Sequence, residues 1–340
     1  MTELKEYKNE IFLGNPQILY SDKKYKIFVD PKIELTYLIL EIMRYKTGFS
    51  QYRISDYMQK QIASFSSYID HPVFETLLGM FRRGFSYDAI PGILHRINGD
   101  GSLKENLIRN EYYIRRAGGE KIIENFVIQL HDFNKDINYL EYFYKNSSFY
   151  KEQGNKTLSN IRKIDIITTL NAFFGETAGK INICLTPDAT HGYGVTVDYD
   201  NQTEMYPTLG NIDDPLQYLS FLIHELSHPF VNPLIYKENE MVSITESLYK
   251  PIEQKMRRQV YPNWEITLIE HIVRAITIKI MCITFPSNNE KEMIEKEINK
   301  GFIYIETIIG SLDYYLNHRN EYKIFRTYFN KLLEDVTDLI

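Results

Sequence analysis

The spacing of apolar and polar positions predicts helices over most of the chain. An apolar run at residues 25–29 predicts a short strand, and Asp30 followed by Pro31 is typical of the start of a helix. From about residue 52 to residue 170 the helical period continues, and few polar groups converge there. We therefore expect this half of the chain to be a helical scaffold.

The pattern changes at Gly179. Residues 181–187 and 195–200 are rich in β-branched side chains and alternate in polarity, which predicts two strands that form a hairpin or lie side by side. The segment 203–214 is polar and contains Pro and Gly, so it predicts a connection. Helical patterns return from Pro215 and continue to the end.

These elements predict an α+β fold that is mostly helical and has a small β-sheet next to the helix that begins at residue 215. The change of pattern separates a mainly helical N-terminal region, residues 1–178, from a second region, residues 179–340, which holds the candidate chemistry described below. The 340 residues correspond to about two domains at roughly 150 residues each. Because no linker or internal repeat separates the two regions, one continuous domain is the alternative.

Composition narrows the class of protein. Hydrophobic residues make up 44% and charged residues 25%, values that exclude wholesale disorder. The net charge of −6 offers no basic excess for nucleic acid, and Cys184 with Cys282 cannot form a disulfide framework. We find neither an apolar membrane span nor a leader, which predicts a cytoplasmic protein. A secreted or periplasmic protein is the alternative if a signal peptide has been removed.

The chemistry of the chain is concentrated in the H-E-x-x-H string of His224, Glu225 and His228. Asp214 and Pro215 predict the start of its helix. Two histidines four residues apart lie 40° apart around a helix and about 6 Å apart along it, so both can reach one ion. Glu225 projects about 100° away from His224, where its carboxylate can take a proton from a zinc-bound water.

Chance accounts poorly for this string, because the composition of the chain gives roughly 0.01 expected matches. Two ordinary histidines on a surface or core helix are the alternative interpretation. Pro229 directly after the string removes a helical hydrogen bond, and Pro233 follows. We therefore expect the helix to end at the site.

A zinc site for hydrolysis needs a third protein ligand. The extended H-E-x-x-H-x-x-G-x-x-H pattern fails, since Val231 and Leu234 occupy its Gly and His positions. Two carboxylates remain as candidates. Glu270 lies at the edge of the apolar face of a strongly predicted helix and is favoured, whereas Glu246 lies in a more polar segment that is typical of a solvated side chain.

The strings HELSHPFVNP and W-x5-E-H-I-V-R-A resemble a bacterial family of zinc-peptidase-like proteins catalogued as a domain of unknown function. The segment from Val29 to Leu35 is also similar to the start of that family, and the resemblance spans about residues 25–285. It implies a zincin-like fold and a gluzincin-type metallopeptidase. In this family pattern His224, His228 and Glu270 hold Zn²⁺, and Glu225 is the general base.

One position departs from better-studied gluzincins, which often carry an acidic residue four positions after the ligand glutamate. Arg274 stands there in this chain. It could brace Glu270, meet a carboxylate of the substrate, or form a structural ion pair. His271, next to Glu270, projects about 100° away from it and is expected to lie outside the ligand set.

In zincins a strand that precedes the site helix pairs with an extended substrate, and the segment 181–200 has the right place in the chain for that role. Tyr193 or His191 in its turn could donate to the developing oxyanion, although an ordinary loop residue is the alternative for both. Weaker donor candidates on a late helix are Tyr314, Tyr315 and His318.

The sequence therefore predicts a zinc-dependent metallopeptidase that acts on a peptide or protein, with no nucleic-acid or membrane partner. In this interpretation Glu225 is the general base and Tyr193 is the oxyanion donor. A catalytically silent zinc-binding or peptide-binding module is one alternative, and a metallohydrolase that does not cleave peptides is the other.

Overall fold

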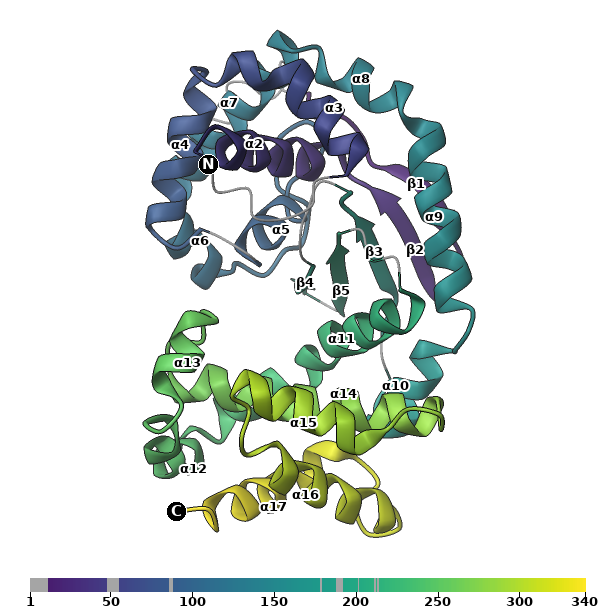
Figure 1. The fold of residues 1–340 in the computed structure, drawn as a ribbon. Helices are drawn as coiled ribbons and strands as arrows, with labels where there is room; N and C mark the ends of the chain where they lie inside the picture. Colours follow the sequence, from purple (N-terminus) through teal and green to yellow (C-terminus); the bar gives the residue numbers. More distant parts are fainter. Residues whose placement is uncertain are drawn as a thin grey trace. The chain divides into compact units, whose positions relative to one another are not determined.

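The computed structural model describes most of the chain, namely residues 12–47, 55–85, 88–177, 179–187, 192–200, 202–210, 212 and 214–340. These residues are mostly helical and also form one sheet of five strands, which confirms the expected α+β class (Figure 1). No helix within these ranges is long and apolar enough to span a membrane.

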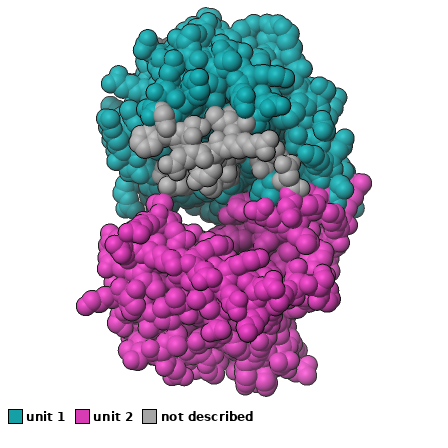
Figure 2. All heavy atoms as spheres, in the orientation of Figure 1, with its two compact units in different colours: residues 1–159, 179–213 teal, residues 160–178, 214–340 magenta. Residues whose placement is uncertain are grey.

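The chain forms two compact units (Figure 2). The first unit comprises residues 1–159 and 179–213, and the second comprises residues 160–178 and 214–340. The chain thus changes unit near residue 179, where the pattern changes, but the strands that follow belong with the preceding helices. The helices from residue 214 onward form their own unit together with a short segment from before the strands.

The sheet lies in the first unit, and three of its five strands come from the segment after residue 179. Its order is β1-β2-β3-β5-β4. β2 pairs in parallel with β3 and β3 with β5, whereas β1 and β4 are antiparallel edge strands. The strands are β1 Gln17–Ser21, β2 Tyr25–Val29, β3 Ile181–Leu185, β4 Tyr193–Tyr199 and β5 Gln202–Leu209.

Two expectations for this segment were wrong. β3 and β4 do not form a hairpin, because β5 lies between them. The supposed connection at residues 203–214 contains most of β5, in which Met205, Tyr206 and Leu209 are buried. Glu204 and Pro207 interrupt the apolar pattern of this strand, so the sequence does not alternate between apolar and polar residues as a strand should. β5 is buried because β3 and β4 pair with it on both sides.

Helices surround this sheet in the first unit, and the helical pattern expected between residues 52 and 170 is present (Figure 1). α2 begins directly after Asp30 and is buried along most of its length, and α5 contacts β4. The helices are α2 Pro31–Thr47, α3 Asp56–Phe65, α4 Pro72–Arg82, α5 Ala89–Leu94, α6 Glu111–Ala117, α7 Glu120–Asp136, α8 Tyr139–Lys145 and α9 Ser147–Ile161, with a 3-10 turn η1 at Ser66–Tyr68.

The second unit is built around α14 Trp264–Thr284, which packs against α11, α15 and α16. Its apolar side chains, including Leu268, Ile272 and Ile276, are buried. The other elements are α10 Ile166–Phe174, α11 Pro215–Lys237, α12 Asn239–Ile244, η2 Thr245–Tyr249, α13 Glu253–Arg258, α15 Glu290–Lys300, α16 Ile305–Asn317 and α17 Phe325–Thr337.

α11 does not end at Pro229, so the expectation that the helix stops at the site was wrong. The helix continues through Pro229 and Pro233 to Lys237. Each proline removes one backbone hydrogen bond, but Val231, Leu234 and Ile235 beyond Pro229 are buried. Their packing holds the last two turns in place despite the missing bonds.

Candidate metal centre

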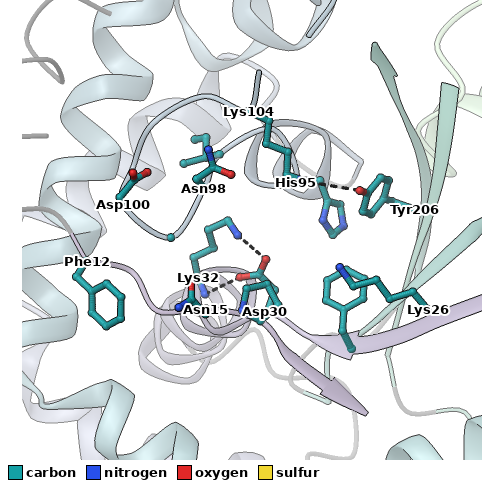
Figure 3. A pocket seen from close by; sticks show the side chains of 14 residues that line it. Phe12, Asn15, Lys26, Asp30, Lys32, His95, Asn98, Asp100, Lys104 and Tyr206 are labelled. Atoms are coloured by element: carbon teal, nitrogen blue, oxygen red, sulfur yellow. Dashed lines mark hydrogen bonds and ion pairs between the residues drawn. The ribbon is translucent and has the colours of Figure 1, made fainter. Parts of the chain in front are cut away.

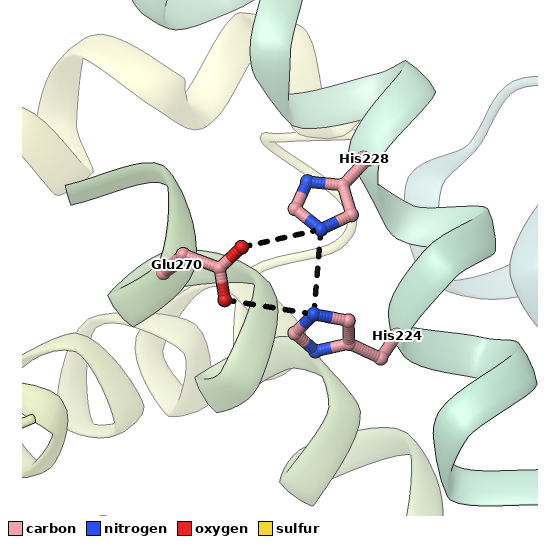
Figure 4. A group of neighbouring side chains, drawn as sticks. All are labelled: His224, His228 and Glu270. Carbon is pink, nitrogen blue, oxygen red and sulfur yellow. Dashed lines mark hydrogen bonds and ion pairs between the residues drawn. The ribbon is translucent and has the colours of Figure 1, made fainter. Parts of the chain in front are cut away.

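Three side chains of the second unit converge on one point (Figure 4). His224 and His228 come from α11 and Glu270 from α14. Their ring nitrogens Nε2 lie 3.3 Å apart, and each lies 3.6 Å from one carboxylate oxygen of Glu270. In the described part of the chain this is the one group of three His, Cys, Asp or Glu side chains close enough to share a metal ion.

Local sequence signals position both helices. The Asp214 carboxylate accepts hydrogen bonds from the backbone N–H groups of Leu216 and Gln217 at 2.7 and 2.9 Å, as expected of an N-cap. The side chain of Asn263 caps α14 in the same way. α11 packs against α14, and its histidine face points toward Glu270 on that helix. The side chains of His224 and His228 are 15% and 17% exposed to solvent.

The distances within this group fit a tetrahedral zinc site. Two ligands that each lie about 2.0–2.1 Å from zinc at a tetrahedral angle are about 3.3–3.4 Å apart. The nitrogen–nitrogen distance of 3.3 Å matches this value, and the two nitrogen–oxygen distances of 3.6 Å are slightly longer. Two imidazoles and a carboxylate are also the donor set of hydrolytic zinc sites. The residues present therefore fit Zn²⁺.

Electrostatics favours the ligand form of His224. Burial, the neighbouring His228 and the positive charge of Arg274 together hold the pKa of His224 well below its usual range. The ring is therefore neutral near pH 7 and keeps a lone pair for a metal ion.

Asn232 orients the second histidine. Its side-chain oxygen Oδ1 lies 3.1 Å from Nδ1 of His228. With Nδ1–H as the donor, Nε2 keeps its lone pair and faces Glu270. Asn232 was missed in the sequence because the helix was expected to end at Pro229. The sequence did contain a signal for this contact, because residues four apart on a continuous helix lie side by side.

Arg274 braces Glu270 from the same helix. Its guanidinium lies 3.3 Å from Oε2 of Glu270 and 2.8 Å from Oε2 of Glu297. It also donates to the Tyr261 hydroxyl at 3.2 Å and lies 4.2 Å from the centre of the Phe302 ring. Two of the roles open for Arg274, the brace and the structural ion pair, are thus present together.

Tyr261 joins this group without any signal in the sequence. Burial and the adjacent Glu270 carboxylate raise the pKa of Tyr261, so its hydroxyl keeps its proton. The residue lies before the N-cap of α14, in a segment with no motif of its own. Its hydroxyl therefore borders the candidate metal centre as a proton-bearing group.

The other glutamates have different surroundings. Glu225 follows His224 on α11 and is half-buried. Glu246 lies in η2, is exposed, and does not belong to the converging group. The structure thus brings Glu270, rather than Glu246, to the two histidines, and the ligand role of Glu270 remains a prediction.

The remaining polar candidates of the second unit make structural contacts. His271 is buried beside Trp264, its Nδ1 donates to the Thr267 carbonyl at 2.8 Å, and burial lowers its pKa to about 4. Tyr315 donates to the Phe173 carbonyl at 2.7 Å, and His318 stacks on Tyr314. Each of these side chains thus has a structural partner, and their role as donors is not tested by these contacts.

The candidates near the sheet belong to the first unit. Tyr193 is the first residue of β4, and His191 lies outside the described residues. β4 is an edge strand of the sheet, and part of its outer edge is already bonded: the carbonyls of Thr196 and Asp198 accept from the Arg96 guanidinium at 3.1 Å and from the Ile108 N–H at 2.9 Å. An edge strand is the kind that can pair with an extended peptide, and that role for β4 stays a prediction, as does the oxyanion role of Tyr193.

The comparisons with known proteins identify one family. A family profile described as Domain of unknown function (DUF4932) matches residues 98–335. No curated protein and no solved structure matches this chain. The matched segment spans well over half of the sequence and includes α11 and α14, which carry the converging side chains.

Proposed function

The chain belongs to the family described as Domain of unknown function (DUF4932), and from the side chains that it brings together we propose that it is a zinc-dependent metallopeptidase. The observation that carries this proposal is the convergence of His224, His228 and Glu270 at distances suited to zinc. The H-E-x-x-H string adds Glu225 at the position of a general base.

The histidines and Glu270 would hold the metal, and their neighbours would keep them in ligand form. When bound, zinc supplies Lewis-acid chemistry, because it acidifies water to a pKa near 7 and polarises a carbonyl group. Asn232 directs the lone pair of His228, and the Arg274 guanidinium lies 3.3 Å from the Glu270 carboxylate, which favours its charged form. Such outer contacts orient ligands before a metal arrives.

Glu225 carries out the proton transfers in this proposal. Its carboxylate follows His224 by one residue, about 100° around α11 from the ligand face. It would take a proton from the attacking water and then give one to the leaving amine. The Tyr261 hydroxyl, which keeps its proton, is a donor within the same unit that could hydrogen-bond the substrate.

Elemental analysis of the purified protein tests the metal. We expect about one zinc per chain, and His224→Ala should remove most of it because two remaining ligands hold zinc poorly. His318→Ala is the matched control, since that residue is the C-cap of α16 and its ring stacks on Tyr314. Unchanged zinc in His224→Ala, with full zinc in the control, would show that the ion lies elsewhere.

Digestion of a peptide library with and without chelator tests the reaction. Glu225→Gln should keep zinc but lower the hydrolysis rate by about 100-fold or more, because it removes the general base. A zinc-loaded protein that cleaves no peptide would contradict the peptidase proposal. Full activity in zinc-loaded Glu225→Gln would instead contradict the role of Glu225.

A further inference from the structure

A second candidate site lies in the first unit and uses none of the residues of the candidate metal centre. It is a cavity of about 380 Å³ whose lining includes three lysines (Figure 3). Lys26 comes from β2, Lys32 from α2, and Lys104 from the segment before α6. Its volume lies in the range that binds small organic molecules.

Only one of these three ammonium groups has a carboxylate partner among the described residues. Lys32 pairs with Asp30, and both side chains are almost fully buried. Lys26 and Lys104 form no ion pair within the described ranges; their charges meet the faces of Phe28 and Tyr206, each with the nitrogen 5.0 Å from the ring centre. Lys104 also lies 3.4 Å from the Tyr206 hydroxyl. Two half-buried cations therefore share a cavity without a direct ion pair among the described residues, and the Glu204 and Asp30 carboxylates act on both from farther away.

The other titratable groups around the cavity balance these two charges only in part, because the Glu204 and Asp30 carboxylates raise the pKa of Lys26 and Lys104 by less than burial lowers it. Burial and the surrounding cations hold the pKa of His95 well below its usual range, so its ring is neutral. The exposed Asp100 carboxylate at the rim accepts hydrogen bonds from the backbone and hydroxyl of Ser102, at 2.9 and 2.5 Å. Glu204 accepts from the Tyr206 hydroxyl at 2.5 Å.

Burial in the cavity destabilises the charged form of Lys104. Burial, followed by the positive charge of Lys32, lowers the pKa of Lys104 to about 8, and burial also lowers the pKa of Lys26. Both shifts mean that the charged forms are destabilised in this place. A bound anion would reverse that penalty, because opposite charges in a partly buried site attract strongly.

Contacts between distant segments build the wall of the cavity. The backbone N–H of Leu13 donates to the Gly99 carbonyl at 2.6 Å. A Cβ atom at Gly99 would lie 2.6 Å from the Gly14 carbonyl oxygen, so this close approach requires glycine. The segment that contains Phe12 and Asn15 is thereby held against the loop that contains Asn98. The cavity is thus a defined feature of the fold.

We propose that this cavity binds a small organic anion, whose carboxylate or phosphate oxygens contact the ammonium groups of Lys26 and Lys104 and whose apolar body lies against Phe28 and Tyr206. Oxyanions suit two ammonium groups that form no ion pair with a described carboxylate, and charge-assisted hydrogen bonds are the strong ones. The aromatic walls offer the apolar contact that small-molecule sites use for most of their surface.

Isothermal titration calorimetry of the full chain tests this proposal. The probes are phenyl phosphate, benzoate and phenol, at constant ionic strength, so that two anions are compared with a neutral molecule of the same ring. We expect saturable binding of one molecule per chain for at least one anion, at least tenfold tighter than phenol. The tighter of the two anions identifies the head group as phosphate or carboxylate.

Substitutions locate the bound anion. Lys104→Gln and Lys26→Gln should each weaken the binding of the anion at least tenfold, while Lys60→Gln, an exposed lysine on α3, should leave it unchanged. Neither variant breaks the buried pair of Lys32 and Asp30, and circular dichroism checks the fold of each. The absence of saturable binding by both anions, or equal affinity in all three variants and the wild type, would overturn the proposal.

Discussion

At the scale of single residues, each histidine of the candidate metal centre depends on a neighbour to present the right atom. A free imidazole has two tautomers, and only one leaves Nε2 as an acceptor. Asn232 selects that tautomer for His228 through Nδ1, and the nearby cations and burial keep His224 neutral. Glu270 is held by Arg274, whose other contacts are Glu297 and Tyr261. The ligand atoms are thus oriented by groups outside the ligand set.

Replacement of Glu270 separates the two candidate third ligands. Glu270→Ala should lower zinc affinity by more than about 100-fold, beyond the 10–100-fold loss typical of outer contacts. Glu246→Ala removes an exposed carboxylate of the same type and should leave affinity nearly unchanged. Competition with a fluorescent zinc chelator measures both values. The reverse order of the two variants would transfer the ligand role to Glu246.

Replacement of Asn232 tests the orientation of His228. Asn232→Leu keeps a side chain of similar size but removes the acceptor, and we expect zinc affinity to fall by about 10- to 100-fold with the fold intact. Asn232→Asp keeps an acceptor and should retain most of the affinity. Equal losses in both variants would mean that Asn232 acts by packing alone, without selecting a tautomer.

At the scale of elements, α11 shows how packing can override a local signal. Pro229 and Pro233 argue for a helix end, and the helix nevertheless continues to Lys237. The buried side chains of its last turns include Val231 and Ile235. Because the helix continues, Asn232 lies one turn after His228 and can reach its ring.

The stability of α11 tests whether packing keeps the helix intact in spite of the hydrogen bond that Pro229 removes. Pro229→Ala restores one backbone donor inside the helix and should raise the free energy of unfolding by up to about 3 kcal/mol. Pro215→Ala is the matched control, since Pro215 is the first helical residue and lacks a backbone bond in any case. Urea unfolding in the presence of chelator, followed by circular dichroism, measures both. No gain in the free energy of unfolding, or an equal gain in Pro215→Ala, would mean that Pro229 does not weaken α11.

At the scale of the whole molecule, the two candidate sites belong to different units. The side chains of the candidate metal centre lie in the second unit, on α11 and α14, and the lysine-lined cavity lies in the first. A ligand that binds only the folded form stabilises the part that holds it. The two ligands should therefore protect different segments of the chain.

Hydrogen exchange followed by mass spectrometry tests this separation. Removal of zinc with chelator should increase exchange most strongly in α11 and α14, because an ion held by His224, His228 and Glu270 would link these two helices directly. β2, β3 and β5 in the first unit serve as the internal control and should change little. A uniform increase over both units would mean that the metal stabilises the whole chain or that it binds in the first unit.

The sequence by itself determined the features that depend on local spacing. Four-residue spacing places His224 and His228 on one helical face, and Asp214 with Pro215 marks the start of that helix. The mostly helical α+β class and the short strand at residues 25–29 follow from periodicity, and the structure has both. Each of these features involves groups within a few residues of one another, where backbone geometry alone sets their relation.

Only the tertiary structure decided which distant groups meet. The approach of Glu270 to the histidines, the contact of Tyr261 with Arg274 and the insertion of β5 between β3 and β4 depend on packing between separate segments. The same holds for the cavity at Lys26 and Lys104. Burial against a neighbouring segment, rather than local propensity, stabilises these contacts. The sequence did not predict them because no local pattern indicates which segment will be the neighbour.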